Sequence, residues 1–137
     1  MEDYFSVRLP EDTVLSLGNT GIAHIGDAVY ELLTRSYLCI GGKTNGKNIH
    51  RATVELVCAP TQARLCEHLL PLLTEEEREI FRRGRNTNVH FIPHNATRAE
   101  YQKATALEML FGLLYLTGRK ERANELFCAM MEGYDAT

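Results

Sequence analysis

Apolar residues recur at helical spacing through most of the 137-residue chain, and no run alternates apolar and polar residues as a half-buried strand does. Thr74 and Glu77 form a capping box, Pro60 suits a first helical turn, and Gly41–Gly42 and Gly84 are typical of helix ends. The pattern predicts an all-α bundle of six or seven helices. The expected ranges are 9–17, 19–39, 48–57, 60–70, 74–84, 97–117 and 119–133.

The segments between these ranges are short, apart from a loop expected over 86–96 that contains Pro93. Asn19 or Thr20 is expected to cap the second helix through its side chain. A chain of this length is typical of one domain, here spanning 1–137, with a core that needs no disulfide or structural metal.

Composition excludes several classes of protein. No apolar run reaches the roughly 18 residues of a membrane span, and Glu2 and Asp3 stand where a signal peptide carries positive charge, so we expect a cytoplasmic protein. The four cysteines form no C-x-x-C pair and have no histidine at zinc-ligand spacing, which favours small buried thiols in a reducing compartment. The metalloprotease pattern H-E-x-x-H and the phosphate-binding P-loop are both absent.

A net charge of −3 argues against a simple polycationic nucleic-acid binder, but the basic residues are clustered. The two blocks are Lys43, Lys47, His50 and Arg51, then Arg82, Arg83 and Arg85, with Arg98 and Lys103 in addition. An RNA-binding surface is therefore compatible with the overall acidity.

Glu108 is the only charged residue in ATALEMLFGLLYL, residues 104–116. Apolar residues surround it on nearly every helical face, so this helix is expected to be central and mostly buried. A buried carboxylate is costly unless it is paired. Three alternatives for its partner stay open: a divalent cation, an arginine or lysine, or an ordinary structural hydrogen bond.

Asp27 follows Gly26 inside the second predicted helix, where glycine costs about 1 kcal/mol relative to alanine. A helix accepts that cost where another backbone passes close by. His24, Asp27 and Glu31 form a polar stripe beside the apolar one, and a solvated face with Glu31 paired to Arg35 is the alternative. Carboxylates on two packed helices would suit Mg²⁺ or Mn²⁺, whose chemistry on a phosphate defines a metal phosphohydrolase.

Several ordered segments resemble the ribonuclease III catalytic domain, in particular its Mini-ribonuclease III branch. IGDAVYELLTR (25–35) is similar to the family's signature helix, and ATALEMLFGLLYLTGR (104–119) to its second acidic helix. The branch's intermediate motifs are matched by KTNGKNIHRAT (43–53), VCAPTQA (57–63), FRRGRN (81–86) and PHNATRAEYQKAT (93–105). Motifs in this order are far more specific together than any one alone.

The resemblance implies a dimeric ribonuclease III-like helical bundle in which Asp27 and Glu108 are both the metal ligands and the catalytic residues. The implied cofactor is Mg²⁺, with Mn²⁺ as a substitute. The implied reaction hydrolyses double-stranded RNA to 5′-phosphate and 3′-hydroxyl ends, and the usual substrate of the branch is precursor large-subunit (23S) rRNA. Whether a ribosomal protein bound to that RNA is a further partner stays open.

Two positions depart from the full-length family pattern, which has further acids where this chain has Ala23 and Thr105. The chain also has no room for an added double-stranded-RNA-binding domain. The Mini branch shares all three features, so they narrow the assignment. They leave open whether a site holds one ion or two.

RNA contacts are expected from both basic blocks and from the loop before the second acidic helix. The expected residues are Lys47, His50, Arg51, Arg82, Arg83, Arg85, Asn86, His94 and Asn95. Gly84 is expected to let the backbone approach a phosphate, whereas Arg82 and Arg83 are equally explained by the dipole of the helix that they end. The apolar side of the signature helix, with Tyr37, is the expected dimer contact.

Two other functions remain open at this level. The first is a catalytically inactive RNA-binding or scaffolding module. The second is a helical nucleotide pyrophosphatase, which uses E-x-x-E pairs; Glu76 and Glu79 have that spacing, but no second pair accompanies them in a core helix.

Overall fold

The structure is a computed structural model that describes residues 1–43, 45–88, 91–92 and 94–136. Every regular element in these ranges is helical, so the expected all-α fold is confirmed. The elements are α1 (Glu11–Leu15), α2 (Asn19–Ile40), α3 (Ile49–Val57), α4 (Ala59–Leu69), the 3₁₀ turn η1 (Leu70–Leu72), α5 (Glu75–Arg85), α6 (Arg98–Leu116) and α7 (Lys120–Asp135).

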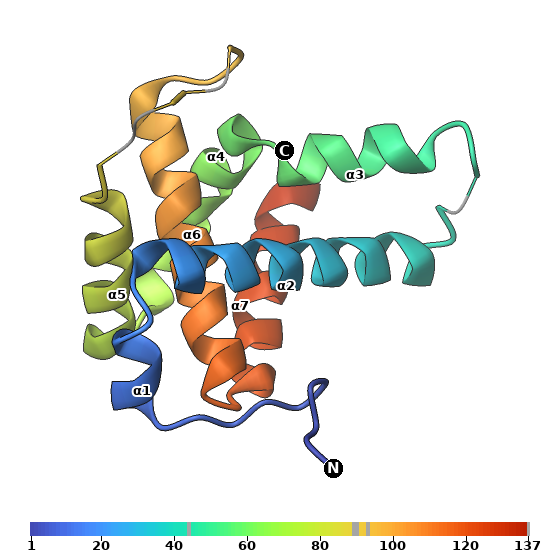
Figure 1. Cartoon of the computed structure of the whole chain (residues 1–137). Coiled ribbons are helices and arrows are strands. Elements are labelled where there is room, and N and C mark those ends of the chain that lie inside the picture. The colour runs from blue at the N-terminus through green and yellow to red at the C-terminus, as the bar shows by residue number, and fades with distance from the viewer. Residues whose placement is uncertain (44, 89–90, 93, 137) are drawn as a thin grey trace.

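Helix α6 lies at the centre of the bundle, as its apolar sequence predicts. It is buried on nearly all sides from Ala104 to Leu114, with only Thr105 and Glu108 partly accessible in that stretch. It packs against α1, α2, α4, α5 and α7. Figure 1 shows α2 crossing in front of it, with α5 on one side and α7 on the other.

Tyr30 joins four helices in the core. Its ring makes edge-to-face contacts with Phe111 of α6 and Phe127 of α7, at centroid distances of 5.8 and 5.7 Å. Its hydroxyl donates to the carbonyl of Leu56 in α3, at 3.0 Å. The buried polar tip is thus satisfied, and α2 is fixed against its neighbours.

Two expectations about helix ends are wrong. The N-cap of α2 is Gly18, in a left-handed conformation with φ of 85°, and no side chain caps the helix; the side chain of Asn19 bonds to the end of α5 instead. Gly84 does not end α5, which continues to Arg85. A Cβ on Gly84 would lie 2.6 Å from the Cα of Ala106, so this glycine allows α5 to pack on α6 and does not free the backbone for a phosphate.

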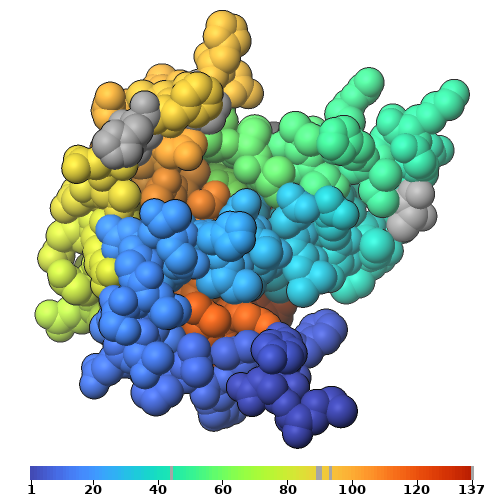
Figure 2. Space-filling model, in the orientation of Figure 1, coloured from blue at the N-terminus to red at the C-terminus, as the bar shows by residue number. Residues whose placement is uncertain are grey.

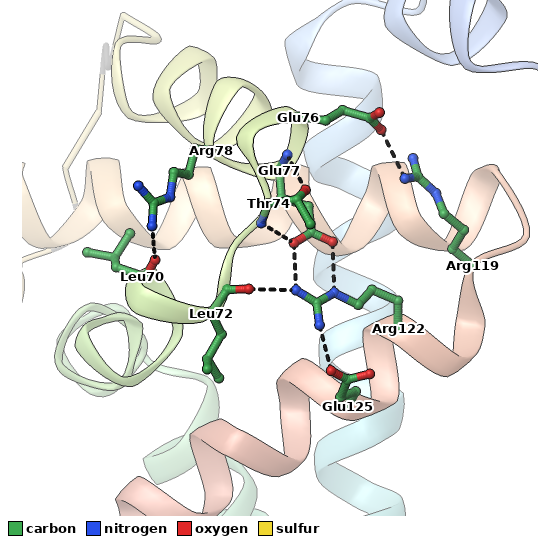
Figure 3. Close-up of polar contacts among 9 residues, drawn as sticks. All are labelled: Leu70, Leu72, Thr74, Glu76, Glu77, Arg78, Arg119, Arg122 and Glu125. Atoms are coloured by element: carbon green, nitrogen blue, oxygen red, sulfur yellow. Dashed lines mark hydrogen bonds and ion pairs between the residues drawn. The ribbon is translucent and has the colours of Figure 1, made fainter.

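A polar cluster fastens the start of α5 to α7 (Figure 3). The predicted capping box of Thr74 and Glu77 is present. Glu77, whose side chain is 3% exposed, also accepts two hydrogen bonds from the Arg122 guanidinium at 2.8 Å, and that group donates to the carbonyl of Leu72 as well. These bonds hold the pKa of Glu77 below its usual range, against an opposing effect of burial.

The cysteines are unpaired, and the expectation of buried thiols holds for Cys66 but is wrong for Cys39 and Cys128, which are exposed. Among the described residues, no helix combines the length and the hydropathy that crossing a bilayer requires.

Candidate active site

Helices α2 and α6 cross at a point built from glycine. A Cβ on Gly26 would lie 1.6 Å from the backbone oxygen of Glu108, and one on Gly112 would lie 2.2 Å from that of Ile22. The expectation that Gly26 marks a close backbone approach is therefore confirmed. Asp27 is the next residue along α2, so the crossing places the two acids of the predicted pair beside each other.

Burial raises the pKa of Glu108 to about 8, and the neighbouring charge of Asp27 contributes to the rise. The pKa of Asp27 is also raised, first by partial burial and then by Glu31, while His24 opposes the shift. No described lysine or arginine forms an ion pair with either acid. Two adjacent carboxyl groups with raised pKa values therefore have no lysine or arginine partner in the described part of the chain, and their oxygen donors fit a hard divalent cation.

The two acids open into a cavity of about 360 Å³. Its walls come from three segments: α2 with Asn19, Thr20, Ala23, His24 and Asp27, α6 with Tyr101, Thr105 and Glu108, and the end of α5 with the following loop, which supply Thr87, Asn88 and Phe91. The two acids with raised pKa values are thus accessible from solvent, and a substrate group can reach them.

Ala23 and Thr105 line this same cavity, at the positions where the full-length family pattern has acids. The hydroxyl of Thr105 donates to the carbonyl of Tyr101 within its own helix. Within the described ranges, no group of three or more His, Cys, Asp and Glu side chains is arranged to bind a metal. The protein therefore offers two carboxylates, and water and substrate would complete the shell of a bound ion.

The loop wall of the cavity was not predicted from the sequence. Asn19 was expected to be a helix cap, and Thr87, Asn88 and Phe91 carried no pattern that set them apart from other loop residues. Phe91 is 77% exposed, an unusual position for a large aromatic side chain beside two acids.

The first basic block lies away from this cavity. Lys43, Lys47, His50 and Arg51 are all exposed, between the end of α2 and the first turn of α3. Figure 2 shows this segment, in teal, projecting from one end of the molecule. Asp27 and Ile40 are thirteen positions apart along α2, which corresponds to about 20 Å of helix.

The arginines of the second block point to different sides of α5. Arg82 and Arg85 line a groove of about 370 Å³ with Arg78 and with apolar residues of the α4–α5 junction. Arg82 is also paired with Glu79 at 2.7 Å. The guanidinium of Arg83 turns the other way and donates to Asn19 and to the carbonyl of Leu15.

The remaining predicted RNA contacts, Asn86, His94 and Asn95, are exposed. His90 and Pro93 of the same loop lie outside the described residues. Arg98 is exposed at the start of α6, and Lys103 is paired with Glu67 at 2.9 Å.

Apolar hollows lie along α2 on two sides. Leu32, which is 55% exposed, borders a hollow that also includes Tyr4 and Phe5 of the N-terminal segment. Ile40, 88% exposed, borders a second hollow between α2 and α7. Tyr37 lines this second hollow, and its hydroxyl donates to Asp135 at 2.9 Å.

Comparison with known proteins gives consistent results. The model of the ribonuclease III domain family matches residues 21–119. The Mini-ribonuclease 3 proteins of Symbiobacterium thermophilum and Enterococcus faecalis are each 41% identical to this chain, over 84% and 80% of its length and 88% and 85% of their own. A crystal structure of a Fusobacterium nucleatum protein superposes with a TM-score of 0.76 at 28% identity, covering 86% of this chain and 94% of that one.

Proposed function

The chain belongs to the ribonuclease III family, in its Mini-ribonuclease 3 branch, and is an endoribonuclease; from this premise we propose that Asp27 and Glu108 hold the divalent cation with which it cuts double-stranded RNA. The observation that carries the proposal is the placement of these two acids. They meet at the α2–α6 crossing, they open into a cavity, and both have raised pKa values, while no lysine or arginine of the described residues forms an ion pair with either of them.

Mg²⁺, with Mn²⁺ as a substitute, would supply positive charge that both stabilises a phosphate undergoing attack and makes a water molecule easier to ionise. The protein's part is to present two oxygen donors on rigid helices. With a pKa of about 8, Glu108 is mostly protonated at neutral pH until a cation displaces the proton. Two carboxylates are enough for one ion, and the number bound with RNA present stays open.

The proposed substrate is duplex RNA, in particular precursor 23S rRNA, with 5′-phosphate and 3′-hydroxyl products. This finer assignment rests on family membership. The open cavity is compatible with it, since duplex RNA is recognised through its phosphates and 2′-hydroxyls, not through a deep pocket for one base.

We assign phosphate contact to the exposed basic residues, and Arg78 joins the predicted set because it shares the groove of Arg82 and Arg85. The full set is Lys47, His50, Arg51, Arg78, Arg82, Arg85, Asn86, His94 and Asn95. Arg83 is left out because its guanidinium is partly buried and donates to both Asn19 and Leu15, whereas the bonds of Arg78 and Arg82 are exposed; RNA contact by Arg83 stays an untested prediction.

A second copy of the chain is the proposed occupant of the apolar surface of α2. Large side chains such as Leu32 and Ile40 are otherwise left in water, and such patches mark interfaces between proteins. A homodimer would present two cavities and two sets of basic residues to one duplex.

The test is cleavage of an end-labelled RNA duplex with Mg²⁺, using Asp27→Asn and Glu108→Gln variants that are shown to be folded by circular dichroism. Both variants are expected to bind the duplex and not to cut it. Glu125→Gln, which changes an exposed carboxylate of α7, is the control and is expected to cut at the wild-type rate. Cutting by either site variant at the control rate would refute the assignment of these acids.

A further inference from the structure

The start of α2 and the end of α5 are joined by a closed set of hydrogen bonds. The side-chain amide of Asn19 donates to the hydroxyl of Thr87 at 2.9 Å, and its oxygen accepts from Arg83. The Thr87 hydroxyl donates to the carbonyl of Arg83 at 3.1 Å, and the Arg83 guanidinium also donates to the carbonyl of Leu15 at 3.3 Å. We call Asn19, Arg83 and Thr87 the α2–α5 tie.

The donor and the acceptor of each hydrogen bond in the tie are defined. The amide oxygen of Asn19 accepts from one partner while its nitrogen donates to the other, so the amide cannot flip without losing both bonds. The hydroxyl of Thr87 is likewise a donor to one group and an acceptor from another. Such a set fixes the relative placement of the two helix ends more narrowly than one contact would.

The tie stands at the edge of the cavity. Asn19 and Thr87 both line it; Thr87, Asn88 and Phe91 supply its loop wall, while Asp27 and Glu108 line it from α2 and α6. The chain leaves α5 at this point, so the position of Thr87 sets where that wall begins.

We infer that the α2–α5 tie is a positioning device, which holds Thr87 and Asn88, on the loop wall of the cavity, at the separation from the acids that a bound RNA backbone requires. This inference rests on the proposed function. Arg83 then acts on RNA binding through Asn19 and Leu15, without touching a phosphate itself.

The positioning role predicts a change in KM for RNA, because the loop wall is the part of the cavity that we propose to contact the substrate, while none of the tie's hydrogen bonds goes to Asp27 or Glu108. Thr87→Val removes the hydroxyl at nearly constant volume. We expect KM to rise by about three- to tenfold, the range that one lost hydrogen bond produces, while the Mg²⁺ concentration for half-maximal cleavage stays at the wild-type value.

The chain offers a matched control in Thr117, at the end of α6. Its hydroxyl donates to the carbonyl four residues earlier at 2.7 Å and accepts from a guanidinium at 3.0 Å, much as Thr87 does with its own partners. Thr117 does not line the cavity. Thr117→Val is expected to lower the melting temperature about as much as Thr87→Val but to leave KM unchanged, and Thr87→Ser is expected to restore most of the lost affinity.

Variants of Arg83 distinguish a positioning role for this residue from direct contact with an RNA phosphate. A lysine can replace an arginine as a point charge on a phosphate, but its single nitrogen cannot stand in for both Nε and Nη2, the two separate nitrogens through which Arg83 donates to Asn19 and to Leu15. We expect Arg83→Lys to raise KM as much as Arg83→Ala does, and neither to change the slope of binding affinity against salt. Loss of an arginine that contacts a phosphate, which we propose for Arg85, lowers that slope by about one.

Three results would overturn the inference while leaving the proposed function intact. The first is wild-type KM for Thr87→Val in a protein that cuts RNA. The second is equal effects of Thr87→Val and Thr117→Val on KM. The third is recovery of both affinity and salt slope by Arg83→Lys when Arg83→Ala lowers them. A wild-type protein that does not cut duplex RNA would instead refute the proposed function.

Discussion

Replacing Gly26 with alanine tests whether the α2–α6 crossing determines both the stability and the site. The new Cβ would lie 1.6 Å from the backbone oxygen of Glu108, whereas real Cβ contacts essentially never fall below 3.0 Å. The two helices would have to separate by about 1.4 Å at this point. Backbone atoms of a central helix cannot turn aside as a flexible side chain can, so the separation disturbs the core on both sides.

The expected cost follows from two opposing effects. Alanine favours a helix over glycine by about 1 kcal/mol, while overpacking of a rigid core costs about 1–3 kcal/mol and more where backbone is displaced. We expect overpacking to win, with a net loss of about 3 kcal/mol in the free energy of unfolding. For a chain of this length, that loss lowers the melting temperature by roughly 10 °C.

Gly21 provides the control because it lies on the same helix and is exposed. A Cβ there would have only the Leu17 Cβ near it, at 3.9 Å, which is an ordinary contact. Gly21→Ala is expected to be neutral or to stabilise the protein by up to about 1 kcal/mol. The assay is urea unfolding of both variants, followed by circular dichroism, together with the Mg²⁺ concentration needed for half-maximal cleavage.

Gly26→Ala is expected to need more Mg²⁺ as well, since the shift moves Glu108 away from Asp27. A Gly26→Ala protein as stable as Gly21→Ala, with an unchanged Mg²⁺ requirement, would refute the reasoning that the glycine crossing builds the site.

Three other predictions follow from the charges and surfaces. The pKa of Glu108 is about 8 in the folded protein and about 4.5 in the unfolded chain, so the folded state loses stability as the pH rises between these values. Glu108→Gln should therefore stabilise the cation-free protein by on the order of 3 kcal/mol at pH 7 and by little at pH 4. Urea unfolding in the presence of EDTA measures the difference. The ion pair that lowers the pKa of Glu77 stabilises the fold at pH values above the pKa that this carboxyl has in the unfolded chain, and this stabilisation is lost as the solution is acidified. Arg122→Ala should therefore lower the free energy of unfolding by about 3 kcal/mol at pH 7 and by much less at low pH. Equal losses at both pH values would count against the ion pair. Leu32→Glu should shift sedimentation from dimer to monomer, and a dimer of wild-type affinity would exclude this part of α2 from the interface.

The sequence predicted the core of the site because its signals are local. Glu108 is the only charged residue in the apolar stretch 104–116, and Gly26 is costly inside a helix, so each residue stands out from its neighbours. The position of Gly26 predicted a close backbone approach, which the α2–α6 crossing confirms, whereas the pairing of Asp27 with Glu108 was implied by the family resemblance.

Gly84 shows why the same kind of signal failed elsewhere. Glycine ends helices and also lets helices pack closely, and a local pattern does not distinguish these uses. The deciding neighbour, Ala106, is 22 residues away along the chain. Asn19 was misjudged for a similar reason, since its partners Arg83 and Thr87 are 64 and 68 residues distant and a short polar side chain at a helix start is usually a cap.

The central claim, that Asp27 and Glu108 together hold a divalent cation, is tested most directly by anomalous diffraction from crystals soaked in Mn²⁺. The account predicts an anomalous peak within coordination distance of both carboxylates. Crystals of an active protein in which Mn²⁺ binds elsewhere, with no peak between these two side chains, would contradict it.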